Sequence, residues 1–141
     1  IVGGVVMPWL IARLDRLAPV PVVLALSTCA GWAGVLLAAD HAPLAWATLL
    51  GIGGMCFPLA LALLTARTRT ALTTARLSGF VQPGGYILAG LVPLLVGMVR
   101  GATGNWTAML IGLMVLTLGM LVAGLRATKH VYIEDELAGA L

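Results

Sequence analysis

The chain has 141 residues, of which 61% are hydrophobic and only 9% are charged, and its mean hydropathy is +1.09. A soluble domain contains roughly 45–50% apolar and about 25% charged residues, and a chain this short cannot bury so much apolar surface inside one water-soluble core. The net charge of +3 comes without the basic helix or the clustered Lys and Arg residues of a nucleic-acid-binding domain. The composition therefore excludes a soluble domain and a nucleic-acid partner, and it predicts a protein that has the lipid bilayer as its solvent.

Five apolar segments follow one another along the chain. A membrane-spanning helix needs about 20 mostly apolar residues to cross roughly 30 Å of hydrocarbon. Four segments meet this length and the first is shorter; in chain order they are residues 1–12, 20–38, 44–66, 77–99 and 107–125. Because no charged residue precedes the short first segment, we interpret it as part of a helix that begins before residue 1, and we expect the chain to be a fragment. The sequence predicts an all-α, polytopic transmembrane bundle at residues 1–126 and a tail at residues 127–141.

The basic residues indicate an orientation, because the cytoplasmic loops of membrane proteins carry the excess of Lys and Arg. Seven of the eight basic residues lie in the first loop, the third loop and the tail; they are Arg13, Arg16, Arg67, Arg69, Arg76, Arg126 and Lys129. Only Arg100 lies in the loops on the other side. The sequence therefore predicts a multi-pass protein of the cell (inner or plasma) membrane with a cytoplasmic C-terminus.

The fourth segment carries a row of polar side chains. Ser78, Gln82 and Tyr86 are four residues apart and therefore share one face of a helix. One interpretation is that this face lines a solute pathway. The alternative is that the side chains hydrogen-bond to a neighbouring helix, which contributes only about 0.6 kcal/mol per bond in membrane bundles.

Two proline-containing stretches predict breaks in the helices. Pro83 removes a backbone hydrogen bond and is followed by Gly84 and Gly85, so the fourth segment is expected to kink or loosen there. In the third segment, a glycine-rich stretch at 51–54 precedes Pro58. These breaks are typical of flexible pore-lining helices, although close packing with a static kink explains them equally well.

The residues of catalytic and metal sites do not form a recognisable constellation. Cys29 and Cys56 fall inside apolar runs, where a cysteine acts as a small hydrophobic residue. His41 and His130 lie in separate loops, and no residues have metal-ligand spacing. No nucleophile has a partner that would activate it. The sequence therefore predicts no enzyme activity, no cofactor and no metal.

A specific pattern runs through the fourth segment and the loop after it. Residues 75–82 read Ala-Arg-Leu-Ser-Gly-Phe-Val-Gln, residues 85–93 read Gly-Tyr-Ile-Leu-Ala-Gly-Leu-Val-Pro, and residues 103–106 read Thr-Gly-Asn-Trp. This pattern resembles the penultimate helix and following loop of the cyanate and nitroimidazole transporter family, within the major facilitator superfamily. The Phe-Pro-Leu-Ala-Leu-Ala-Leu run at 57–63 is similar to the tenth helix of that family. The resemblance implies that the five segments are helices eight to twelve of a twelve-helix protein, which is part of its C-terminal half.

The resemblance also implies a function. It predicts a secondary transporter that moves a small polar or anionic solute by alternating access between two six-helix halves. The partners would be the solute and the missing N-terminal helices of the same protein. The candidate solute contacts on the tenth and eleventh helices are Gln82, Tyr86, Ser78, Met55 and Phe57.

The first loop, at residues 12–16, resembles the second copy of the superfamily's cytoplasmic loop motif. In that motif an Asp-Arg pair closes the inner gate, so Asp15 and Arg16 are candidate gating residues. The copy is degenerate, because Ala18, Pro19 and Val20 stand where the motif has a glycine and basic residues.

The alternative to a transporter is a small, non-transporting membrane subunit that packs in a larger complex. An upstream reading frame that encodes seven more spans would favour the transporter. A natural start codon just before Ile1 would favour the subunit.

Overall fold

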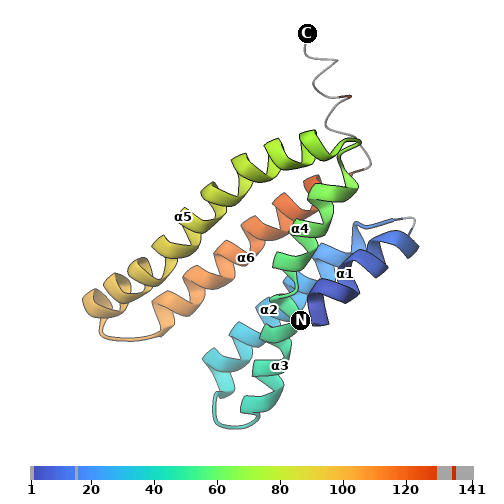
Figure 1. Cartoon of the computed structure of the whole chain (residues 1–141). Coiled ribbons are helices and arrows are strands. Elements are labelled where there is room, and N and C mark those ends of the chain that lie inside the picture. Colours follow the sequence, from blue (N-terminus) through green and yellow to red (C-terminus); the bar gives the residue numbers. More distant parts are fainter. Residues whose placement is uncertain (1, 15, 130–134, 136–141) are drawn as a thin grey trace.

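The computed structural model describes residues 2–14, 16–129 and 135, and within these residues it contains only helices and connecting turns (Figure 1). The helices are α1 (Val2–Arg13), α2 (Pro19–Ala38), α3 (Pro43–Gly53), α4 (Cys56–Ala66), α5 (Ala71–Thr103) and α6 (Thr107–Ala127). Four helical stretches of the described chain are long and apolar enough to cross a membrane; they are Pro19–Ala38, Pro43–Ala66, Ala71–Thr103 and Thr107–Ala127. The predicted all-α transmembrane bundle is confirmed.

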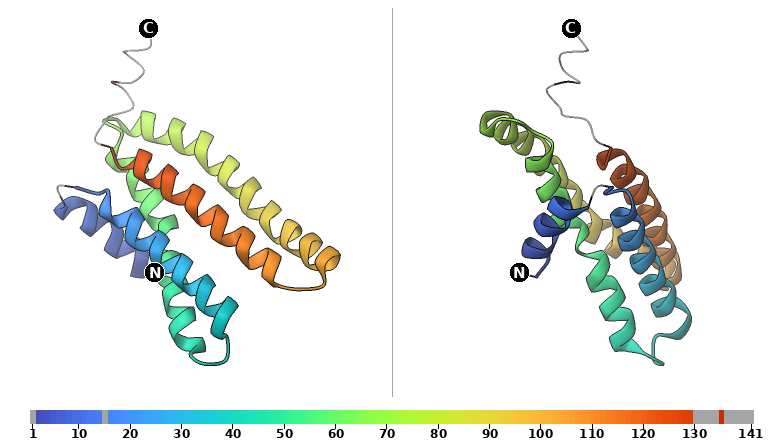
Figure 2. Two further views of the ribbon diagram at one scale, coloured as in Figure 1. Left: turned by 180° about the vertical axis from the view of Figure 1, so that it is seen from behind. Right: turned by 90° about the vertical axis from the view of Figure 1, so that its right-hand side faces the viewer.

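The helices pack unevenly against one another. Helix α2 packs against α3 and α6, while α1 packs against α4. Helices α5 and α6 form a long hairpin, and the side view of Figure 2 shows α2 and α6 together on one side of the bundle. For its length, helix α5 makes few contacts with its neighbours, and none of its described side chains is buried. Its surface is therefore open to lipid or to further protein.

The buried core lies where α1, α2 and α4 meet. Its buried members are Met7, Leu17, Val20, Leu24, Leu59 and Leu63. Each is an apolar side chain, so the core excludes water, but it leaves most of the apolar surface of α5 and α6 outside. The core therefore joins the first four helices more firmly than it joins α5.

The third predicted span is interrupted. It consists of α3 and α4, which are separated by a turn at Gly54 and Met55. The backbone N–H of Met55 donates to the carbonyl oxygen of Ile52 at 3.0 Å, which is the tighter spacing of a 3₁₀ turn. Pro58 explains the position of this turn, because its ring would clash with the carbonyl group of Gly54, four residues earlier, in a regular α-helix.

The break expected at Pro83, Gly84 and Gly85 does not occur. Helix α5 continues through these residues and through Pro93 without interruption. Figure 1 shows α5 as a bowed helix, and gentle bending spreads the distortion caused by a proline over several turns. None of the residues of α5 is buried.

Helix α5 also extends beyond the predicted range of 77–99, because both of its ends are capped. The side chain of Thr70 accepts a hydrogen bond from the N–H of Thr73 at 3.2 Å, as a helix N-cap does. At the other end, Gly104 adopts φ +69°, a left-handed conformation that ends helices and suits glycine. The 33 residues of α5 would measure about 50 Å in length, so this helix exceeds a hydrocarbon core of roughly 30 Å.

Candidate functional site

A large cavity lies between α2, α3, α4, α5 and α6, with a volume of about 990 Å³. Its walls are mostly aliphatic and aromatic, and representative lining residues are Trp32, Leu50, Phe57, Leu77, Leu116 and Met120. Ligand pockets in proteins usually measure about 300–1,000 Å³ and are lined mainly by apolar side chains with a few polar groups. The size and lining of this cavity fit such a pocket.

The hydroxyl groups on the cavity wall are already used inside their own helices. Thr28 Oγ1 donates to the carbonyl oxygen of Leu24 at 2.8 Å, and Thr117 Oγ1 donates to that of Leu113 at 2.8 Å. A threonine hydroxyl has one proton to donate. Neither threonine therefore keeps a hydrogen-bond donor for a bound molecule, and each hydroxyl oxygen can only accept a hydrogen bond from it.

Two arginines are the charged side chains on the described wall of the cavity. Arg67 follows the last residue of α4, and Arg126 lies in the last turn of α6. Figure 1 shows that these two helices end at the same end of the bundle. The cavity is therefore apolar along most of its length and positively charged at one end.

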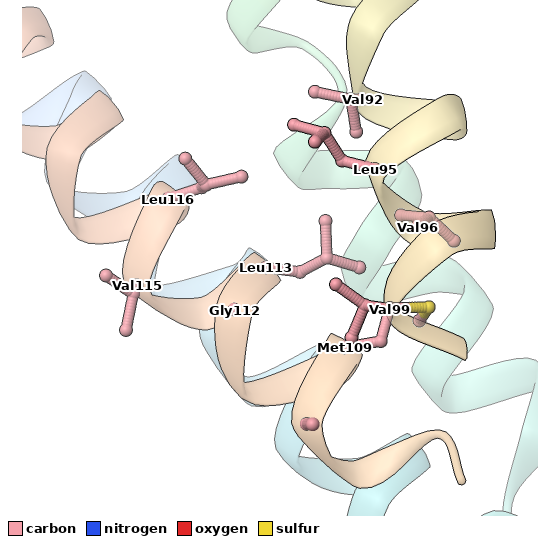
Figure 3. Close-up of a pocket in the computed structure, with 10 residues that line it drawn as sticks. Val92, Leu95, Val96, Val99, Met109, Gly112, Leu113, Val115 and Leu116 are labelled. Carbon is pink, nitrogen blue, oxygen red and sulfur yellow. The ribbon is translucent and has the colours of Figure 1, made fainter. Parts of the chain in front are cut away.

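A second, smaller cavity lies between α5 and α6 and has a volume of about 360 Å³. Figure 3 shows the side chains of Leu95 and Leu113 between the two helices. All ten lining residues are apolar; they include Val92, Val96, Val99, Met109 and Leu116. Without a polar side chain on its wall, this cavity cannot orient a polar solute.

The predicted solute contacts are spread over several places. Phe57 lines the large cavity and is 58% exposed. Met55 lies at the turn between α3 and α4, half-buried against the core. On α5, Ser78 and Gln82 are half-buried, whereas Tyr86 is exposed. The structure thus brings one of the five, Phe57, onto the cavity wall.

The polar face of α5 lies next to the face that lines the cavity. Leu77 and Val81 line the cavity. Leu77 directly precedes Ser78 and Val81 directly precedes Gln82, and these two polar residues belong to the polar face. One residue along an α-helix corresponds to a rotation of about 100°. The polar face is therefore rotated by about 100° from the face that lines the cavity, and Ser78 and Gln82 are half-buried there.

The two candidate gating residues lie between α1 and α2. Arg16 is exposed, while Asp15 lies outside the described residues. The neighbouring Leu17 is buried in the core and holds this loop against the bundle.

Sequence reasoning missed the cavity residues Arg67 and Arg126. In the sequence, both residues stand out only as loop charges that indicate orientation. A signal was present, because each directly borders a predicted span, but the sequence does not show that Arg67 and Arg126 line one cavity.

Comparison with known proteins identifies the family. The chain is 33% identical to the 2-nitroimidazole transporter of Escherichia coli K12 over 127 residues, which cover 89% of this chain and 32% of that protein. It is 37% identical to a putative anionic 4-hydroxy-benzoate permease of Thauera aromatica over 116 residues, which cover 73% of this chain and 71% of the permease. The chain belongs to the cyanate and nitroimidazole transporter family. The cyanate transport protein CynX of Escherichia coli K12 is 31% identical over 124 residues, or 82% of this chain and 32% of CynX.

These relatives confirm the predicted resemblance and describe a membrane protein family. All three are named as transporters or permeases, so the family is one of transport proteins and not of enzymes. The chain spans about a third of the length of the 2-nitroimidazole transporter and of CynX. No family model matches the chain, and no solved structure matches it.

Proposed function

We propose that the gene product is a secondary transporter that moves a small polar or anionic solute across the cell membrane by alternating access. The observation that carries this proposal is the identity of 31–37% over most of the chain to transporters named for cyanate, 2-nitroimidazole and 4-hydroxybenzoate. Cyanate and 4-hydroxybenzoate are anions, and 2-nitroimidazole is a small planar polar molecule. Residues 1–141 would form part of one half of such a transporter, and helices outside this range would form the rest.

In this proposal the polar face of α5 contacts solute. Gln82 offers an uncharged donor and acceptor, which avoids the large cost of placing a charge inside the membrane. Ser78 and Tyr86 would add hydroxyl groups on the same face, and Met55 and Phe57 would contribute from the interrupted third span. The absence of buried side chains on α5 supports this role, because it leaves the helix surface free to meet the other half.

The interrupted span supplies a place where the bundle could bend. The turn at Gly54 and Met55 lacks the regular hydrogen-bond ladder of an α-helix, and such interruptions absorb backbone rotation when domains rock. Asp15 and Arg16 would act at the gate on the arginine-rich side, which we place in the cytoplasm together with the C-terminus.

Uptake by cells tests this proposal. The complete gene product would be expressed in a bacterial strain that lacks its own transporters for the three solutes, and uptake of radiolabelled cyanate, 2-nitroimidazole and 4-hydroxybenzoate would be compared with that of a vector control. We expect faster uptake of at least one solute and competition by the unlabelled compound. Uptake equal to that of the vector for all three, with the protein present in the membrane, would contradict the proposal.

A further inference from the structure

We infer that the large cavity formed by α2, α3, α4, α5 and α6 binds an organic monoanion with an apolar body, whose carboxylate is bound by Arg67 and Arg126. This inference deepens the proposed function and rests on it for the role of the cavity in a solute pathway. It assigns the carboxylate a place away from the polar face of α5 that carries Gln82, although Phe57, a proposed solute contact, lines this cavity as well.

The charges on the cavity wall select for an anion. Arg67 and Arg126 line it, and no Asp or Glu is among its described lining residues. The described ion pair nearby joins Arg69 to Asp135 at 2.9 Å, and it involves neither of the two cavity arginines. A guanidinium group binds a carboxylate through two parallel hydrogen bonds, which makes arginine suited to this ligand.

The remaining wall selects for an apolar body. Beyond the arginines, the cavity is lined mainly by side chains such as Leu50, Leu63 and Met120. The hydroxyl groups of Thr28 and Thr117 donate to their own helices, so a sugar-like solute would lose its hydrogen bonds with water and regain few. An aromatic ring or a short alkyl chain would instead gain by leaving water.

The presence of arginine at these two positions has another explanation, which an experiment must distinguish from anion binding. Basic residues at the C-terminal ends of helices stabilise the helix dipole, and basic residues on one side of the membrane maintain orientation. These effects depend on charge near the helix ends and do not require that the side chains share a cavity. Arg76 and Lys129 are exposed basic residues in the same group of loops, and they do not line the cavity. They provide a matched control for the loss of two positive charges.

Cys56 provides a direct readout of the cavity. It is a free, half-buried cysteine on α4 that lines the cavity, whereas the other free cysteine, Cys29, does not line it. In the complete gene product, every cysteine other than Cys56 would be replaced by alanine, and the rate at which methyl methanethiosulfonate modifies Cys56 would be measured in membranes. Benzoate, benzamide and acetate would be added as probes, because benzamide lacks the charge and acetate lacks the apolar ring.

We expect benzoate to slow the modification of Cys56, and benzamide and acetate to have little effect at the same concentration. The double variant Arg67→Gln/Arg126→Gln should weaken the protection by benzoate roughly tenfold to a hundredfold, as expected when charge-assisted hydrogen bonds are lost. The control Arg76→Gln/Lys129→Gln should keep the protection. If the first variant does not reach the membrane, Arg67→Lys/Arg126→Lys can be used instead, because it keeps both positive charges. It should weaken the protection of Cys56 by benzoate, because lysine lacks the planar guanidinium group that forms two parallel hydrogen bonds.

Three results would overturn the inference. Cys56 that never reacts would show that other protein fills the cavity. Equal protection by benzamide would show that charge is not recognised. Full protection in both arginine variants would show that these residues do not hold the carboxylate. Solute uptake without protection of Cys56 would refute this inference alone, whereas protection without uptake of any solute would refute the proposed function alone.

Discussion

Gly34 of α2 lies against the indole ring of Trp46 of α3 so closely that a methyl group at position 34 would overlap the ring. The indole Nε1–H of Trp46 donates to the carbonyl oxygen of Ala38 at 2.9 Å, which fixes the ring in this position. We therefore expect Gly34→Ala to destabilise the folded protein by about 1–3 kcal/mol, the usual cost of overpacking. Thermal unfolding of the complete gene product in detergent would measure this change.

Gly51 provides the control for this substitution. It lies in α3, and a methyl group added to it would meet open space. Gly51→Ala should leave the melting temperature unchanged or raise it, because alanine favours helix by up to about 1 kcal/mol over glycine. Equal melting temperatures for both variants would show that α2 and α3 do not pack this closely.

Gln82 tests the proposed solute contacts. If its amide binds solute, Gln82→Ala should weaken apparent affinity in an uptake assay by an amount that corresponds to roughly 1–3 kcal/mol, with membrane abundance unchanged. If the amide instead joins α5 to another helix, the substitution should lower thermal stability and leave the affinity for solute unaltered. The second outcome would remove Gln82 from the proposed site.

Pro83 tests the continuity of α5. Since the helix continues through this residue, Pro83→Ala should restore the hydrogen bond to the carbonyl oxygen of Gly79 and raise the melting temperature, for a gain of up to about 3 kcal/mol. Pro43→Ala is the control, because Pro43 is the first residue of α3 and its missing N–H breaks no helical bond. A lower melting temperature for Pro83→Ala would indicate that the helix is broken there in the complete protein.

The orientation can be measured with single cysteines. Asp40 lies in the turn between α2 and α3 and Lys129 follows α6, and both are exposed, whereas Thr128 is buried and would label poorly. In an otherwise cysteine-free protein, an impermeant thiol reagent outside intact cells should label Asp40→Cys and not Lys129→Cys. Labelling of only Lys129→Cys would invert the proposed orientation.

The sequence predicted the positions of the helices well. Inside lipid, backbone polar groups must be hydrogen-bonded within the chain, so each span is a helix whose long apolar run can be recognised in the sequence. It underestimated the length of α5, since the predicted span of 77–99 lies between Arg76 and Arg100, whereas the capping residues Thr70 and Gly104 lie further out. It also predicted a kink or loosening at Pro83, where α5 continues as one bowed helix.

The cavity could not be derived in the same way. Phe57, Leu77 and Leu116 lie on three different helices, and their meeting depends on how these helices cross. The same holds for Arg67 and Arg126, which become neighbours of one cavity only because α4 and α6 end at the same side of the bundle. Periodicity within a helix identifies a face, but it does not identify the helix that the face meets.

Counterflow in proteoliposomes tests the transport mechanism most directly. Vesicles that contain the complete gene product would be loaded with a high concentration of unlabelled 4-hydroxybenzoate, cyanate or 2-nitroimidazole and diluted into a trace of the same labelled solute. A carrier that alternates access should exchange the two and accumulate label transiently above its external concentration, for at least one of the solutes. Label that never exceeds the external concentration, for all three solutes and with the protein correctly inserted, would contradict a carrier of these solutes.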